Sequence, residues 1–104
     1  MKLVPTNKNG EVIIFMPDTE EGQDTIAPPL GTLAIAGYLE SKGIPILHID
    51  QRVEKKSHQI IMDCIRDGAL CIGMGFGTGP QIKHVIELSE AIKNEYPDFP
   101  FIWG

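Results

Sequence analysis

The chain has 104 residues, enough for one small domain. Its formal net charge is −5 and its one basic pair is Lys55–Lys56, so we do not expect nucleic acid as a ligand. No apolar run approaches the roughly 20 residues of a membrane span, and the first ten residues lack the apolar core of a signal peptide. We therefore expect a cytoplasmic protein with no membrane partner, whose two isolated cysteines, Cys64 and Cys71, are reduced and buried.

The N-terminal part predicts one central strand and one long loop. Residues 1–10 are mostly polar and are expected to form an extension or a short edge strand. Glu11–Met16 is a continuous apolar run, typical of a strand buried on both faces. The loop 17–28 carries four carboxylates whose spacing does not match a calcium-binding loop, so we expect a solvated loop near the functional site: Asp18, Glu20, Glu21 and Asp24.

Pro29–Lys42 predicts an amphipathic helix. Gly43 suits its left-handed stop, and Gly31 and Gly37 are expected to leave room for close approach of a neighbouring element. The apolar residues with helical spacing, which we expect to face the core, are Leu30, Leu33, Ala34, Gly37 and Tyr38.

The next segments predict a second strand and a second helix. Ile46–Asp50 is the strand, with His48 as a hydrogen-bonded core histidine and Asp50 at the carboxyl end, where residues of α/β sheets often face a ligand. The second helix is expected to begin at the N-cap Ser57 and to stop at Gly68. Its expected buried stripe is Ile60, Ile61, Cys64 and Ile65.

The third strand, Leu70–Met74, leads into a glycine-rich turn that ends at Pro80. Such a turn lets the backbone approach a ligand at a helix N-terminus, although the glycines at 73, 75, 77 and 79 could equally serve only for tight packing. The turn contains no dinucleotide fingerprint, no P-loop and no nucleophile elbow. Since the sequence shows no catalytic set either, the residues alone indicate a small-ligand-binding module.

Pro80–Tyr96 predicts a third helix and Phe99–Gly104 a fourth strand. We expect His58 and His84 to lie in water on exposed helix faces. The alternation of strands and helices predicts a doubly wound parallel sheet in the order 2-1-3-4, so the loops 17–28 and 76–80 meet at its switch point. The residues of the third helix that we expect to face inward are Ile82, Val85, Ile86, Ser89 and Ile92.

Three segments together resemble one known family: Ala27–Tyr38 with P-P-L-G, Ile72–Ile82 with T-G-P-Q-I, and Pro97–Gly104 with P-D-F-P-F-I-W-G. They are similar to the N-terminal cobalamin-binding domain of cobalamin-dependent radical SAM enzymes. The resemblance spans nearly the whole chain from Glu11 onward. It implies a Rossmann-like (flavodoxin-like) three-layer α/β domain over residues 11–104, truncated before its fifth strand.

The resemblance implies that cobalamin lies over the carboxyl edge of the sheet, with its nucleotide tail in a crevice beside the third strand. The residues implied on the corrin side are Pro28, Pro29, Leu30 and Gly31. Those implied to meet the tail are Gly77, Thr78, Gly79 and Gln81. Trp103 and Gly104 would complete the floor of the site.

The chain departs from the family pattern in two respects. It lacks the D-x-H-x-x-G motif, so we expect no histidine ligand to cobalt, and it lacks the three-cysteine motif for an iron–sulfur cluster. We interpret it as an inactive fragment whose parent enzyme binds the cluster and S-adenosylmethionine and is its partner. Two alternatives are a Rossmann-like domain without cofactor that serves in protein contacts, and a nucleotide-binding half of another α/β enzyme.

A final helix missing from this fold would leave the first-helix side of the sheet bare. We expect that side to expose Ile72, Met74, Phe101 and Trp103, and the fourth strand to have an unpaired edge. Such a patch predicts self-association through the open edge or face of the sheet.

Overall fold

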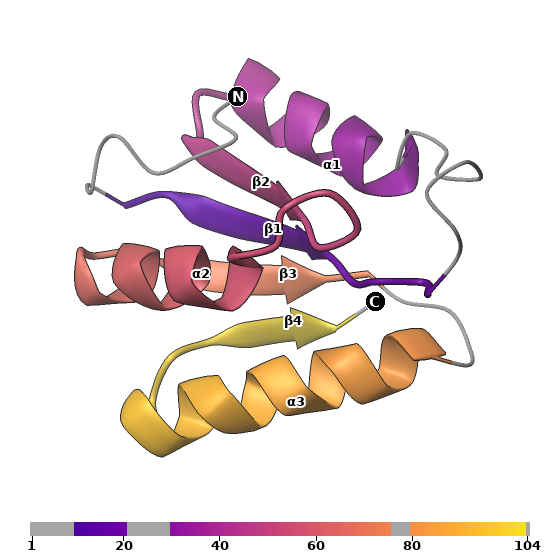
Figure 1. Cartoon of the computed structure of the whole chain (residues 1–104). Coiled ribbons are helices and arrows are strands. Elements are labelled where there is room, and N and C mark those ends of the chain that lie inside the picture. The colour runs from indigo at the N-terminus through magenta and orange to yellow at the C-terminus, as the bar shows by residue number, and fades with distance from the viewer. Residues whose placement is uncertain (1–9, 21–29, 76–79, 104) are drawn as a thin grey trace.

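The computed structural model describes residues 10–20, 30–75 and 80–103. This part of the chain is a parallel α/β fold of the flavodoxin or Rossmann type, as expected, with strand order β2-β1-β3-β4 (Figure 1). None of its helices is both long enough and apolar enough to cross a membrane. The elements in chain order are β1 Val12–Met16, α1 Leu30–Ser41, β2 Ile46–Asp50, α2 Ser57–Arg66, β3 Cys71–Met74, α3 Pro80–Glu95 and β4 Phe101–Trp103.

The sheet places β1 at its centre. Ile14 of β1 lies opposite His48 of β2 on one side and Gly73 of β3 on the other, and Gly73 in turn lies opposite Ile102 of β4. These four residues form one row across the sheet, and their side chains share one face because side chains alternate along each strand. Since the strands are parallel, all their carboxyl ends lie at the same edge, called the carboxyl edge below.

The two faces of the sheet are covered unequally. α2 and α3 pack on one face over a large buried cluster that includes Phe15, Leu47 and Met74. On the other face α1 covers only a small cluster of Ile14, Ala36 and Ile46. β1 and β2 are long apolar runs because they contribute side chains to both clusters, one on each face of the sheet.

The expectation that Ile72, Met74 and Phe101 lie bare on the α1 side is wrong. Ile72 and Met74 are fully buried in the cluster under α2 and α3, and Phe101 packs against the same cluster. Side chains alternate along a strand, and in β3 and β4 the alternation has the opposite phase to the one expected. The residues of these strands on the α1 side are Cys71, Gly73 and Ile102, and Ile102 is 61% exposed.

The core-facing side of α1 also differs from the expected stripe. Thr32 and Ala36 are buried, whereas Ala34, Gly37 and Tyr38 are exposed. The helix is apolar on several sides, so helical spacing alone does not identify the buried side. A Cβ atom added at Gly31 or at Gly37 would meet nothing within 4 Å, so these glycines do not serve close packing.

α2 buries three of its four expected residues, while Ile60 is only half-buried, and the helix begins differently from the expectation. Ile61, Cys64 and Ile65 are buried. The N-cap position is Lys56, and Ser57, expected there, is the first helical residue; no described side chain caps the helix. As expected, Gly68 lies in the left-handed region after the helix, with φ of 112°, and Gly43 does the same after α1, with φ of 84°.

α3 buries three of the five residues expected to face inward, namely Val85, Ser89 and Ile92. Ile82 and Ile86 are instead among the exposed large hydrophobic residues, and Leu88 is buried in their place. Both sets have helical spacing, so periodicity alone does not distinguish them.

Candidate functional site

Three elements named by the sequence resemblance converge at the carboxyl edge. α1 begins there with Leu30 and the exposed Gly31, α3 begins there with Pro80 and the half-buried Gln81, and β4 ends there at Trp103. In an all-parallel sheet each following helix starts where its strand ends, which brings these positions to one edge. The other expected site residues lie outside the described residues: Pro28, Pro29, Gly77, Thr78, Gly79 and Gly104.

An apolar groove lies between α1 and the part of the sheet that α1 leaves uncovered. Its volume is about 200 Å³. It extends from Thr32 and Gly75 at the carboxyl edge towards Val12 and Leu39 at the other end of the sheet. Between these ends it is lined by Ile14, Ile35, Gly73 and Ile102.

The sequence analysis singled out Gly73 and Gly75 but assigned none of the other lining residues to a groove. A Cβ atom at Gly73 would lie 3.3 Å from Cδ1 of Ile14, which is tighter than ordinary van der Waals contact. Glycine here therefore leaves room for Ile14, and this supports the packing explanation for that glycine. It also keeps the floor of the groove free of a side chain between Ile14 and Ile102.

His48 is the hydrogen-bonded core histidine that the sequence predicts. Its Nε2 atom lies 2.8 Å from Oγ1 of Thr32, so the bond joins β2 to the first turns of α1. Burial lowers the pKa of His48 below its ordinary value, although the charge of Asp50 opposes this effect. At neutral pH the imidazole is therefore uncharged, and it stabilises the helix at one end of the groove.

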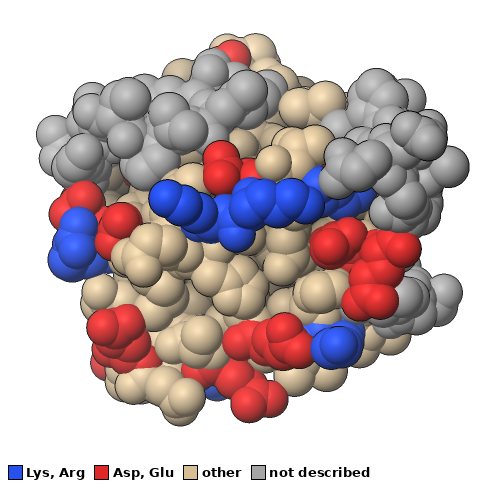
Figure 2. All heavy atoms as spheres, in the orientation of Figure 1, with Lys and Arg blue, Asp and Glu red and all other residues tan. Residues whose placement is uncertain are grey.

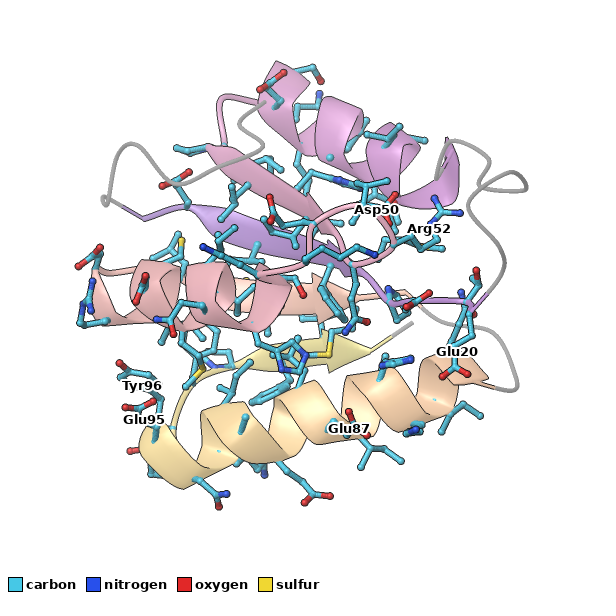
Figure 3. All side chains as sticks on the ribbon, viewed as in Figure 1. Glu20, Asp50, Arg52, Glu87, Glu95 and Tyr96 are labelled. Carbon is cyan, nitrogen blue, oxygen red and sulfur yellow. The ribbon has the colours of Figure 1, made fainter. Side chains whose placement is uncertain are left out.

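Asp50 lies at the carboxyl end of β2 as expected, but its carboxylate is engaged by the chain itself (Figure 3). Oδ1 accepts hydrogen bonds from the backbone N–H and from Nε of Arg52, both at 3.0 Å. Oδ2 accepts from Nη2 of the same residue at 2.9 Å. Because Arg52 is buried, this two-point ion pair holds the turn between β2 and α2 in one conformation.

The start of the loop after β1 is attached to α3. Oε2 of Glu20 accepts a hydrogen bond from Nε2 of His84 at 2.9 Å, and Figure 3 shows Glu20 beside the first turns of α3. Glu20 has a positive φ of 61°, and its N–H donates to Oδ1 of Asp18 at 2.8 Å. The expectation that His84 lies in water is wrong, since its side chain is only 15% exposed.

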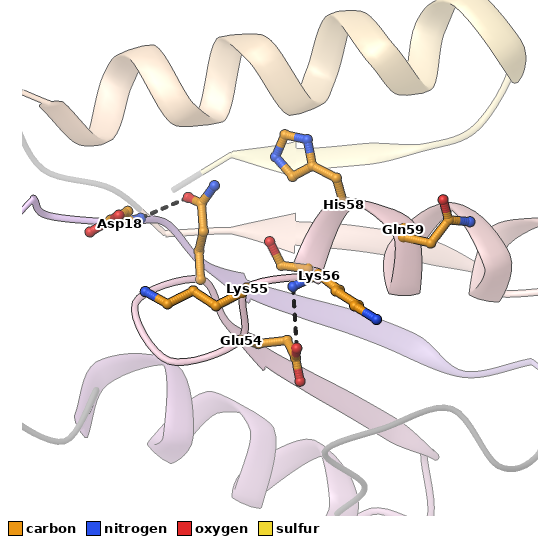
Figure 4. Close-up of a pocket in the computed structure, with 8 residues that line it drawn as sticks. Asp18, Glu54, Lys55, Lys56, His58 and Gln59 are labelled. Atoms are coloured by element: carbon orange, nitrogen blue, oxygen red, sulfur yellow. Dashed lines mark hydrogen bonds between the residues drawn. The ribbon is translucent and has the colours of Figure 1, made fainter.

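His58 is also less exposed than expected. Its side chain is half-buried, and Figure 4 shows it directed from the first turn of α2 towards α3. Its Nε2 atom is buried and has no hydrogen-bond partner among the described residues. Burial lowers the pKa of His58; Glu87 opposes this effect and His84 adds to it.

The described side chains offer no metal site. No group of three or more His, Cys, Asp or Glu side chains among them could hold a metal ion. Cys64 and Cys71 are free thiols as expected, but Cys71 is only half-buried, and burial raises its pKa.

A second pocket, of about 540 Å³ and lined mainly by polar groups, lies on the other side of the sheet at the carboxyl edge (Figure 4). It is formed by Asp18 after β1, by the turn that follows β2, and by the first turn of α2. Figure 2 shows a band of Lys and Arg side chains across this face of the molecule. The sequence analysis missed this pocket because its residues come from two separate connections of the chain.

Comparison of the chain with family models, curated proteins and solved structures finds no match.

Proposed function

We propose that the chain is a cobalamin-binding module of a larger radical SAM enzyme. The observation that carries the proposal is the apolar groove beside β3, which reaches the carboxyl edge at Thr32 and Gly75. α1 and α3 start at that edge and β4 ends there, and these are the segments in which the sequence resembles the family. A crevice at the carboxyl edge of a doubly wound sheet is the usual ligand position in such folds.

The groove fits the flat, largely apolar base of the nucleotide tail of cobalamin. Ile14, Ile35 and Ile102 would contact the base, and the bare backbone of Gly73 would let it lie close to the sheet. The corrin ring would lie over the carboxyl edge, against Leu30, Gly31, Gln81 and Trp103. When bound, the cofactor would supply cobalt chemistry such as methyl transfer, while this chain would bind and orient it.

Two of the described histidines are hydrogen-bonded within the chain and the third is directed towards α3, which supports a cobalt ion without a histidine ligand from this chain. His48 is bonded to Thr32, His84 is bonded to Glu20, and His58 points towards α3. The iron–sulfur cluster and S-adenosylmethionine would belong to the parent enzyme, where the reaction would take place.

Substitution of Thr78 tests the proposal at a position named by the resemblance. If its hydroxyl bonds the tail, Thr78→Val should weaken hydroxocobalamin binding by about 1 kcal/mol, whereas Thr78→Ser should retain the affinity. Equilibrium dialysis of the purified chain measures both constants. Equal affinities for the two variants would remove Thr78 from the site, and no binding by the unsubstituted chain would overturn the proposal.

A second candidate function is a domain for protein contacts. The observation that favours it is the exposure of large apolar side chains on α1 and β4, namely Ile35, Tyr38 and Ile102. Exposed apolar surface of this kind is typical of interaction sites.

A further inference from the structure

A further groove lies at the amino edge of the sheet, the edge opposite the carboxyl edge. Its volume is about 500 Å³. One side is lined by Ile65 of α2 and by Ala69 and Leu70 in the turn before β3. The other side is lined by residues 95–100, which lead from the end of α3 into β4. This amino-edge groove shares no lining residue with the groove on the α1 face.

The walls of the amino-edge groove are mainly apolar, and the fold holds them in place. Tyr96 and Phe99 pack against the large buried cluster under α2 and α3. The rings of Phe99 and Phe101 meet edge to face, with their centroids 6.5 Å apart, and the N–H of Phe99 donates to the carbonyl of Tyr96 at 3.1 Å. Leu70 and Pro100 line the groove as well and are exposed. The groove therefore offers a preformed apolar surface to a partner.

Two carboxylates belong to the same lining. Glu95 and Asp98 are exposed, and neither forms a hydrogen bond or an ion pair with another described residue. Figure 3 shows Glu95 next to Tyr96 at the end of α3. Arg66, at the end of α2, is already paired with two aspartates close to it in sequence. The amino-edge groove thus combines apolar walls with negative charge that the described part of the chain does not neutralise.

The place of these carboxylates on α3 independently favours a cationic partner. Glu95 is the last residue of the helix, and Asp98 lies in the turn that follows. The C-terminus of a helix carries partial negative charge, so carboxylates are unfavourable there and cations are favourable. Lys93 lies in the last turn but forms no ion pair with either carboxylate in the described structure. A positively charged group bound in the groove would remove the repulsion.

We propose that the amino-edge groove is a docking site for a segment of another protein that presents an arginine next to apolar side chains. The guanidinium would pair with Glu95 and Asp98, and the apolar side chains would cover Leu70 and Phe99. Arginine fits better than lysine because its planar guanidinium is less strongly hydrated and stacks on aromatic rings such as that of Tyr96. Since the two grooves share no residue, the proposal goes beyond the cobalamin function and does not depend on it.

Titration of the chain with the capped tripeptide acetyl-Leu-Arg-Leu-amide tests the proposal. The amide resonances of Leu70, Glu95 and Tyr96 should shift and saturate with a dissociation constant on the order of 1 mM, at a constant ionic strength of about 0.15 M. Glutamine in place of the arginine should weaken binding about fivefold through the lost charge. Alanine in place of both leucines should weaken it about fivefold through the lost apolar contact.

Substitutions in the chain locate the binding site. Glu95→Gln and Asp98→Asn should each weaken binding of the arginine peptide about threefold and leave binding of the glutamine peptide unchanged. Glu90→Gln is the matched control, since Glu90 is exposed on the same helix and does not line the groove. It should leave both affinities unchanged.

The proposal is overturned if the three resonances do not saturate, or if either altered peptide binds as tightly as acetyl-Leu-Arg-Leu-amide. An equal effect of Glu90→Gln and Glu95→Gln would also contradict it. Shifts of the same resonances when the chain alone is concentrated would assign the groove to a second copy of the chain, against the proposal. Because the probes are short peptides, none of these outcomes bears on cobalamin binding.

Discussion

His48 is buried and His58 is half-buried, with different consequences. His48 shares a hydrogen bond with Thr32, whereas the buried Nε2 atom of His58 has no partner in the described part of the chain. Burial lowers the pKa of both below the ordinary value of 6.5. The charged form of His58 is disfavoured in the folded chain even though Glu87 attracts it.

We predict that His58 makes the fold sensitive to acid. A lowered pKa in the folded state means that the unfolded chain binds more protons as the pH falls below 6.5. The free energy of unfolding should therefore decrease below that pH and level off once the pH is below the folded-state pKa. Urea unfolding between about pH 5 and pH 8 measures it, and His58→Gln should reduce the dependence. An unchanged pH dependence in His58→Gln would show that His58 does not contribute.

The sequence predicted the environment of His48 but not those of His58 and His84. His48 lies inside an apolar strand, so its burial follows from its neighbours in sequence. His84 is buried by a contact with Glu20, which is 64 positions away in the chain. His58 lies at the start of a helix, and its burial depends on the packing of α2 beside α3. Patterns of neighbouring residues in the sequence do not predict contacts between residues that are far apart in the chain.

At the scale of elements, a glycine that follows a helix and a glycine inside the same helix have opposite effects on stability. Gly43 has φ of 84°, a conformation that favours glycine, and it ends α1. Gly37 lies inside α1, exposed, with nothing near the position of a Cβ atom.

We predict opposite effects of the same substitution at these two positions. Gly43→Ala should destabilise the chain by about 1 kcal/mol, because alanine is strained at positive φ. Gly37→Ala should stabilise it by about 0.5–1 kcal/mol, because alanine has the higher helix propensity. Thermal or urea unfolding of the two variants measures both values. Effects of the same sign would contradict the assigned roles.

The number, type and order of the elements could be predicted from the sequence, because apolar runs and Gly or Pro boundaries mark each of them. The buried face of an element could not always be predicted. α1 is apolar on several sides, and α3 has two overlapping apolar sets, one with Ile82 and Ile86 and one with Leu88. In β3 the sequence shows that side chains alternate between the two faces of the sheet. Which of the two sets faces α1, and which faces α2 and α3, depends on the assembled sheet. Most of the residues that line the groove were missed for this reason.

At the scale of the whole molecule, the uneven covering of the sheet is the dominant feature. β4 lies at one end of the strand order, and Ile102 on its α1 side is 61% exposed. Exposed strand edges and apolar patches both promote association between chains.

We predict that the isolated chain self-associates at micromolar concentration through this region. Ile102→Lys should shift it towards the monomer, because a charge on the patch opposes burial. Val53→Lys is the matched control, since Val53 is 62% exposed in the turn after β2. Sedimentation velocity measures the distribution of species. A monomeric unsubstituted chain, or an equal effect of the two variants, would contradict the prediction.

The central claim is that the groove on the α1 face binds the nucleotide tail of cobalamin. Ile35 of α1 lines this groove and is 55% exposed. Leu70, which directly precedes β3 and is not a lining residue of the groove, is 57% exposed and provides a matched control position.

The most direct test compares Ile35→Glu with Leu70→Glu in equilibrium dialysis against hydroxocobalamin and against cobinamide, which lacks the tail. Ile35→Glu should weaken cobalamin binding about tenfold, because a carboxylate beside the base is poorly solvated, and should leave cobinamide binding unchanged. Leu70→Glu should bind both ligands as the unsubstituted chain does. Equal affinity of Ile35→Glu and Leu70→Glu for hydroxocobalamin would contradict the claim.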